Sequence, residues 1–168
     1  MTFVLALLLV AAPTSCSVSR AEFDRQLALP YEQFDLGEQA TAWRRLNGTG
    51  CTDEAVHVLA SYAVANSRRL SVEHKSELAF HRGQALAFAG RHADAIPHLE
   101  EALRIGGTEE WTSYVAANIA FLKRDAAALR SARDHYAAIA PGSMRLKFVD
   151  GLLACPDAAY MTAAHCAM

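Results

Sequence analysis

The sequence predicts an all-α fold in which consecutive helices pair as antiparallel hairpins. Hydrophobic residues make up 52% of the 168 positions, and alanine and leucine dominate while β-branched residues are sparse, which favours helix over strand. Apolar residues recur at helical spacing from residue 37 onward, and no segment after residue 20 alternates as a strand does. The connections are short, so neighbouring helices should pack antiparallel.

The first residues differ from the rest of the chain. Residues 2–12 read TFVLALLLVAA, an uncharged run of about 11 residues that is too short for a helix to span a bilayer core ~30 Å thick. The run fits the apolar core of a secretory signal, and small residues follow it. We therefore predict a signal peptide over 1–20 and an exported protein, periplasmic or secreted, with no transmembrane span in the mature chain. Since no Lys or Arg precedes the run, a buried N-terminal helix is the alternative, and a lipoprotein anchored at Cys16 is a variant of export.

Cysteine usage agrees with export. The four cysteines are Cys16, Cys51, Cys155 and Cys166. Cys155 and Cys166 flank a short segment and are candidates for a disulfide in an oxidising compartment, although spacing alone does not fix the geometry. If Cys16 leaves with the signal, Cys51 is an unpaired and buried thiol. No Cys-x-x-Cys pair occurs, so neither a zinc ribbon nor a thioredoxin-type site is indicated.

The segment after the predicted signal is the least regular part of the sequence. Residues 21–36 mix charged and aromatic side chains around Pro30, and we interpret them as an irregular entry segment. Residues 37–168 keep a helical pattern and indicate one helical domain. Its first helix is predicted over 37–48, with Gly48 placed to end it. Three of its residues are available for burial: Ala42, Trp43 and Leu46.

The next helices carry clear start and stop signals. Thr52 is placed to cap a helix over 53–67, whose acidic first turn suits the positive end of the helix dipole. Ser71 is placed to cap a helix that Gly90 ends. The apolar positions of the helix over 53–67 have helical spacing: Ala55, Val58, Leu59, Tyr62 and Ala65.

Proline interrupts the pattern of the fourth helix, over 92–105. A missing N–H matters little only in the first turn, so Pro97 implies that this helix starts near Ala93 or bends slightly. The remaining elements are a helix capped by Thr108, one capped by Asp125, one over 144–155 and a short tail helix after Pro156.

Small residues and leucines occupy a characteristic series of positions over 80–105. They are, in chain order, Gly83, Leu86, Gly90, Ala95, Leu99 and Ala102. Small residues let two helix backbones approach closely, and the leucines fill the space beside them. This segment resembles a tetratricopeptide repeat, best matched over 74–106, with weaker echoes in the flanking helix pairs. The resemblance implies that the hairpins stack as a short TPR-like α-solenoid.

In that family the first helix of each pair lines a concave groove that binds an extended peptide or a helix. By register, the resemblance places eight groove candidates in this chain: Glu77, Phe80, Gln84, Phe88, Trp111, Tyr114, Asn118 and Phe121. The alternative is that the aromatic members are core residues. Relatives that grip a terminal carboxylate place a basic residue beside an asparagine, but Tyr114 stands at that place here, so that activity is not carried over.

Chemical signatures are sparse. His74, Glu77 and His81 share one helical face and are the best candidates for a metal site, but no HExxH motif is present. No catalytic residues are assigned, because no nucleophile elbow, Walker loop or dinucleotide fingerprint occurs, and no cofactor is predicted. A net charge of −2 gives no basic surface for nucleic acid.

The leading hypothesis is therefore a non-catalytic protein–protein interaction module whose partner is a protein or a peptide. Two alternatives stay open. One is a small metal-binding protein or enzyme that uses His74, Glu77 and His81. The other is a structural subunit of an envelope assembly, and the sequence leaves the oligomeric state open.

Overall fold

The chain is described over residues 16–35 and 42–167 by a computed structural model, and these residues form ten helices and no strand. The predicted all-α fold of packed hairpins is confirmed. The helices are α1 Arg20–Ala28, α2 Tyr31–Asp35, α3 Ala42–Gly48, α4 Thr52–Ala65, α5 Val72–Phe88, α6 His92–Ile105, α7 Glu109–Leu122, α8 Ala126–Ile139, α9 Met144–Ala154 and α10 Tyr160–Ala164. Residues 37–41, where the first helix of the domain was predicted to begin, lie outside the described residues.

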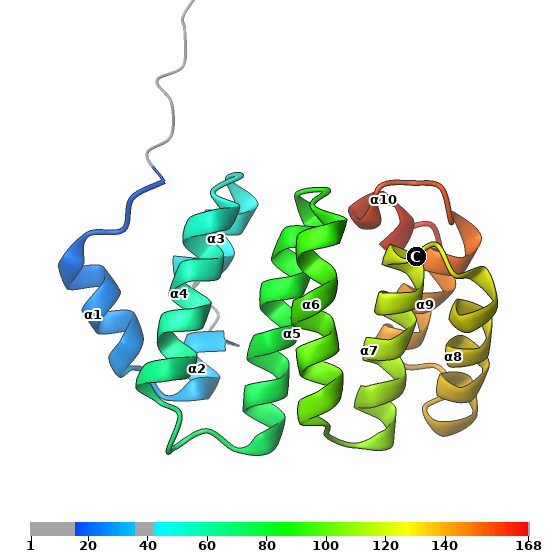
Figure 1. Cartoon of the computed structure of the whole chain (residues 1–168), viewed down its shortest axis with the longest axis horizontal. Coiled ribbons are helices and arrows are strands. Elements are labelled where there is room, and N and C mark those ends of the chain that lie inside the picture. The colour runs from blue at the N-terminus through cyan, green and yellow to red at the C-terminus, as the bar shows by residue number, and fades with distance from the viewer. Residues whose placement is uncertain (1–15, 36–41, 168) are drawn as a thin grey trace, which may run out of the picture.

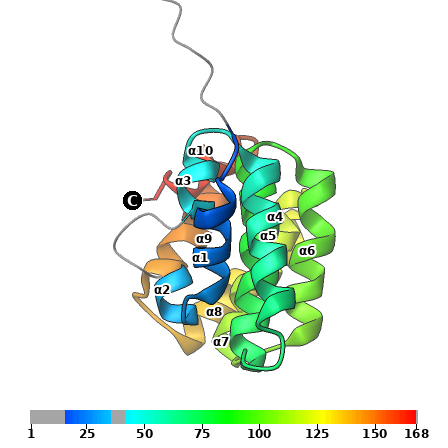
Figure 2. The ribbon, with the colours of Figure 1, turned by 90° about the vertical axis from the view of Figure 1, so that its left-hand side faces the viewer.

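The longer helices stand side by side in a row (Figure 1). The most extensive packing is between helices consecutive in the chain: α5 on α6, then α7 on α8, then α4 on α5 and α3 on α4. In the view along the row, α2, α3, α9 and α10 lie on one side of α4 and α6 (Figure 2). We call the side of α5 and α7 that carries the eight groove candidates the inner face.

The α5–α6 hairpin shows why the repeat pattern is needed. A Cβ placed on Gly83 would lie 2.7 Å from Leu99 Cδ2 and 3.0 Å from the Ala95 carbonyl oxygen, so the two helices touch where the pattern predicted. Gly90 has a φ of +74° and closes the turn, and the Arg91 N–H then donates to the Leu86 carbonyl at 2.9 Å.

The buried residues form two apolar clusters within the described part of the chain. One lies among α2, α3, α4 and the start of α5, where Phe34 stacks on Tyr62 with ring centroids 3.7 Å apart. The other runs from α5 to α10 and includes the repeat residues Leu86, Ala95 and Leu99. Both clusters lie between neighbouring helices, so burial of one face of each helix holds the row together.

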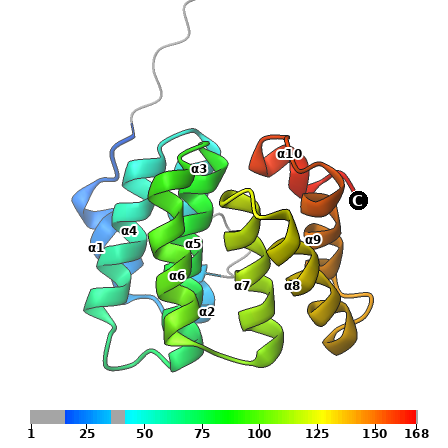
Figure 3. The same cartoon turned by 45° about the vertical axis from the view of Figure 1, so that its right-hand side comes forward.

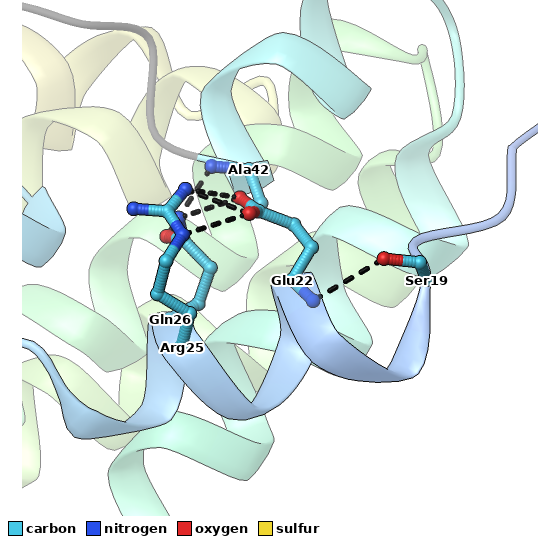
Figure 4. Close-up of polar contacts among 5 residues, drawn as sticks. All are labelled: Ser19, Glu22, Arg25, Gln26 and Ala42. Carbon is cyan, nitrogen blue, oxygen red and sulfur yellow. Dashed lines mark hydrogen bonds and ion pairs between the residues drawn. The ribbon is translucent and has the colours of Figure 1, made fainter.

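The expectation of an irregular segment over 21–36 was wrong, because α1 and α2 cover most of it. Ser19 caps α1 by accepting from the Glu22 N–H, and the Glu22 carboxylate pairs with Arg25 at 2.7 Å (Figure 4). The buried Gln26 donates to Glu22 and accepts from the Ala42 N–H at 3.4 Å, which joins α1 to the start of α3. These polar contacts act together with Phe23 and Leu27 of α1, which pack against the apolar cluster of α2, α3 and α4.

Three of the four predicted caps are confirmed and one is corrected. The side chains of Ser71, Thr108 and Asp125 accept backbone N–H groups at the starts of α5, α7 and α8. Thr52 was expected to cap α4, but it is the first residue of that helix, and Cys51 holds the cap position without a capping hydrogen bond from its side chain. Helix α6 begins at His92 and runs through Pro97.

The described residues contain two disulfides. The predicted pair Cys155–Cys166 is present, with Cα atoms 6.3 Å apart. Cys51 was expected to be buried, and unpaired if Cys16 leaves with the signal; it is buried, and in the described chain, which keeps Cys16, the two cysteines are bonded across a separation of 35 residues. This bond anchors the segment before α1 to the turn between α3 and α4. Within residues 16–35 and 42–167, no helix has the length and apolar character that crossing a membrane requires.

The contact at Gly83 gives a first prediction. Gly83→Ala should destabilise the protein by about 1–3 kcal/mol, because the added methyl overlaps a buried leucine and a backbone carbonyl. Gly48→Ala is the matched control: a Cβ there meets nothing within 4 Å, and stability should stay unchanged or rise by up to ~1 kcal/mol. Urea unfolding of the oxidised proteins, followed by circular dichroism, compares them. Equal midpoints for both variants would contradict the close approach.

Candidate functional site

Five of the eight groove candidates are buried in the core. Their exposed fractions are 2% for Phe80, 7% for Trp111, 5% for Tyr114, 0% for Asn118 and 2% for Phe121. The other three, Glu77, Gln84 and Phe88, are half-buried. The interpretation of these aromatic residues as core residues therefore fits the structure better than an open groove.

The inner face is covered by helices from the C-terminal end of the same chain. The Phe148 ring of α9 packs on Tyr114 with centroids 5.8 Å apart. Tyr160 of α10 donates its hydroxyl to the Asn118 side-chain oxygen, while the Asn118 amide donates to the Tyr114 carbonyl at 2.7 Å. The amide that the resemblance placed in a groove is thus hydrogen-bonded within the chain through both its nitrogen and its oxygen.

Helix α2 covers the beginning of the inner face. The Tyr31 hydroxyl donates to Glu77 at 2.6 Å, and the Tyr31 ring stacks on His74 with centroids 3.8 Å apart. His81, the third member of the metal candidate, instead lies with its Nδ1 3.0 Å from an Asp35 carboxylate oxygen. The three residues have separate partners, and the described residues contain no group of three ligands that would hold a metal ion.

Asp35 is the centre of a buried polar cluster at the end of α2. Its side chain is 2% exposed and contacts His81 and the Arg44 guanidinium, 3.3 Å away. Burial alone raises the pKa of the Asp35 carboxyl, but contact with His81 and the charge of Arg44 outweigh burial and hold that pKa below its ordinary value. Asp35 therefore stays ionised and fixes both Arg44 and His81.

Arg44 and Trp43 extend this cluster from the buried Asp35 to the surface. The Arg44 Nε donates to the Asp35 backbone carbonyl at 2.8 Å, and its guanidinium lies over the Trp43 ring, 4.1 Å from the centroid. Trp43 stacks in turn on His81 with centroids 5.1 Å apart. With its orientation set from two sides, Arg44 remains 39% exposed and available to solutes.

A cleft of about 370 Å³ opens beside this pair, between α3, α5 and α10, and we call it the α3–α5 cleft. In Figure 1 and Figure 3, α3 and α10, which both contribute to its lining, lie at the upper ends of the longer helices. Its lining residues are Trp43, Arg44, Asn47, Gly48, Gly50, Thr52, Gln84, Ala85, Phe88, Ala89 and Met161. Two groove candidates, Gln84 and Phe88, thus line an open surface.

The chemistry of the α3–α5 cleft is mixed. Trp43, Phe88 and Met161 supply apolar surface, while Asn47 and Gln84 supply amides. Arg44 is the single charged side chain among the described lining residues. An apolar cleft with a few oriented polar groups suits a short peptide or small-molecule segment, and the lone cation favours an anionic group on it.

A second hollow lies at the N-terminal end of the row, between α1 and α4. Its lining residues are Phe23, Leu27, Ala60, Ser61, Val64 and Ala65, and Val64 is 76% exposed. The hollow is shallow and mainly apolar, so it offers a surface for packing rather than a site with chemistry.

Sequence reasoning placed Gln84 and Phe88 by helical register but missed their neighbours in the α3–α5 cleft. Trp43 was noted only for burial, although the adjacent Arg44 in the same helix was a usable signal. Met161 reaches the cleft from α10, a contact between distant segments that no local pattern indicates.

Comparisons of the chain with protein-family models, with curated proteins and with solved structures found no match. Its likeness to tetratricopeptide repeats therefore depends on the residues and packing described above.

The buried carboxylate gives a second prediction. Asp35→Asn should lower the free energy of unfolding by about 1–3 kcal/mol at pH 7, because it removes the buried carboxylate that contacts Arg44 and His81. Folding lowers the pKa of Asp35. The ionised carboxylate therefore adds its full share to the free energy of unfolding above the unfolded-state pKa of about 4, and this share is lost as the pH falls through the lower pKa of the folded state. Urea unfolding at pH 7 and at pH 2.5 should show that the difference in free energy of unfolding between wild type and variant is smaller at pH 2.5.

Asp24→Asn is the control for this measurement, because Asp24 is half-exposed and pairs with the exposed Arg20. Its effect should stay within about 0.5 kcal/mol at both pH values. A gap for Asp35→Asn that keeps its size in acid would show that the carboxylate charge is not what stabilises the fold.

Proposed function

We propose that this protein is an exported, non-catalytic interaction module of tetratricopeptide-like type that binds a short peptide segment in the α3–α5 cleft. The observation that carries the proposal is the cleft itself, where apolar rings, amides and one oriented cation converge. The occupant is a segment with an apolar side chain for Trp43 and Phe88 and an acidic side chain for Arg44. The rest of the inner face is packed with the chain's own side chains and is not part of this site.

Polar groups of the cleft match the backbone of such a segment. Gln84 and Asn47 each carry an amide that both donates and accepts, which suits the peptide groups of an extended chain. Arg44 is already bonded to Asp35, so little of its side-chain freedom is lost when a carboxylate binds. The cleft is therefore organised before its ligand arrives.

Export is supported by the disulfides as well as by the apolar N-terminal run. Both bonds suit an oxidising compartment. The Cys16–Cys51 bond also bears on processing, because a cysteine that carries a lipid through its sulfur has no thiol left for a disulfide. We propose a mature chain that keeps an unmodified Cys16, which places signal cleavage before that residue.

The hollow between α1 and α4 favours a second candidate function, a structural subunit of an envelope assembly. The exposed Val64 and its neighbours are an apolar surface at one end of a row of helices, where a further helix would extend the stack. The mass of the purified protein in solution separates the candidates: a monomer favours the peptide receptor, and a defined oligomer favours the subunit.

Peptide binding gives a third prediction. Peptides selected from a displayed library against the oxidised full chain should combine an acidic and a large apolar residue, and Gln84→Ala with Met161→Ala should weaken their binding at least tenfold. Met144→Ala is the control, because Met144 is 66% exposed and does not line the cleft. Fluorescence anisotropy with a selected peptide gives the dissociation constants. An equal loss of affinity in the Met144→Ala control, or no loss of affinity in the double variant, would show that the peptide does not bind in the cleft.

Processing gives a fourth prediction. Mass spectrometry of the protein from an envelope or culture fraction should show a mature N-terminus at or before Cys16, and a tryptic peptide pair linked through Cys16 and Cys51. An N-terminus after Cys16, or a lipid on its sulfur, would contradict the proposed processing. Recovery from the cytosolic fraction with four reduced cysteines would contradict export.

A further inference from the structure

The last helix of the chain is too short to exist alone. Helix α10 has 5 residues, and isolated helices below about 12 residues are marginal in water. Nevertheless Tyr160, Ala163 and Ala164 are between 0% and 1% exposed. The conformation of α10 therefore depends on the surface beneath it, as that of a bound peptide does.

Tyr160 fills a socket that three other helices build. Its ring lies 5.4 Å from Phe88 of α5, 5.9 Å from Phe121 of α7 and 5.7 Å from Phe148 of α9, measured between centroids. Its hydroxyl donates to Asn118 at the base of the socket. Without that hydroxyl, Asn118 would keep a fully buried oxygen with no donor, so the socket is specific for a phenol. We call Phe88, Asn118, Phe121 and Phe148 the Tyr160 socket.

The backbone of α10 rests on a glycine of α9. A Cβ placed on Gly151 would lie 2.5 Å from the Ala163 carbonyl oxygen and 2.9 Å from that of Ala164. Only glycine permits this approach, and the alanines of α10 keep the contact close. The surface thus fits a short helix that carries small residues in the turn after its tyrosine.

A disulfide holds both ends of this segment. Cys155 follows α9 and Cys166 follows α10, so their bond closes a loop around the helix. Cys166 is an exposed residue and Cys155 a half-buried one, so we place the attack of a thiolate at Cys166. While the bond is closed, α10 competes for the Tyr160 socket at a high effective concentration.

We propose that the Tyr160 socket is a binding site for a short helical segment that carries a tyrosine, occupied by the chain's own α10 while the Cys155–Cys166 disulfide is closed. A dithiol reductant opens it. Its thiolate attacks Cys166 Sγ, the Cys155 thiolate leaves and takes a proton, and the second thiol of the reductant then displaces Cys166 as a thiol. The cystine gains two electrons and two protons, the reductant becomes a cyclic disulfide, and residues 156–167 are held at one end only. This site adjoins the α3–α5 cleft, with which it shares Phe88, but the proposal is argued from the contacts of Tyr160 and does not depend on the function proposed for that cleft.

The test uses the full chain and a peptide that reproduces residues 156–167 with Cys166→Ser and a fluorophore. The peptide should bind the Cys155→Ser/Cys166→Ser variant at least tenfold more tightly than it binds the oxidised wild type. A peptide with Tyr160→Phe should bind the variant at least fivefold more weakly, because Asn118 loses its donor. Amide hydrogen exchange at residues 160–164 should become at least tenfold faster in the variant.

The matched control is Cys16→Ser/Cys51→Ser, which opens the other disulfide and should leave exchange at residues 160–164 unchanged. Wild-type protein titrated with dithiothreitol gives the same exchange readout without any substitution, should a variant fail to fold. Unchanged exchange at residues 160–164 once the Cys155–Cys166 bond is reduced would overturn the role of the disulfide. Equal binding of the tyrosine and phenylalanine peptides would overturn the socket.

Discussion

The structure depends on two places where helix backbones come into contact because a side chain is missing. At Gly83, α6 lies so close to α5 that Leu99 fills the space a methyl would take. At Gly151, the carbonyls of α10 occupy the position of a Cβ. The first contact sets the spacing of the central hairpin, on which the flanking helices pack. The second holds the C-terminal segment over the inner face and so decides which part of that face stays open.

The hairpins and their caps could be predicted because each depends on residues close together in the sequence. Ser71, Thr108 and Asp125 accept N–H groups three residues ahead, and Gly83 meets Leu99 across a single turn. The entry helices were missed because α1 is mainly polar and buries only part of Phe23 and Leu27, which leaves little apolar periodicity to detect. Pattern reasoning works here where burial of one helical face is the main cause of structure.

The candidate site was harder to predict because its covering comes from far along the chain. Helical register placed Asn118 and Phe121 on one side of their helix but did not show that Tyr160 lies on them. The same limit applies to Cys51, whose partner is 35 residues away in a segment assigned to a removed signal. Gln84 and Phe88 line an open cleft only because α10 stops beside them, with Met161 at its edge.

The order of synthesis gives the C-terminal helix a further consequence. The helices that cover Asn118 and Phe121 follow α7 in the chain, so a nascent chain that has reached only α7 presents this aromatic surface without Tyr160. Uncovered apolar surface of this kind promotes association between nascent or truncated chains. A stop codon before residue 155 would therefore yield a product in which the α5–α6 hairpin can still form but the aromatic surface stays exposed, so its solubility should be poor.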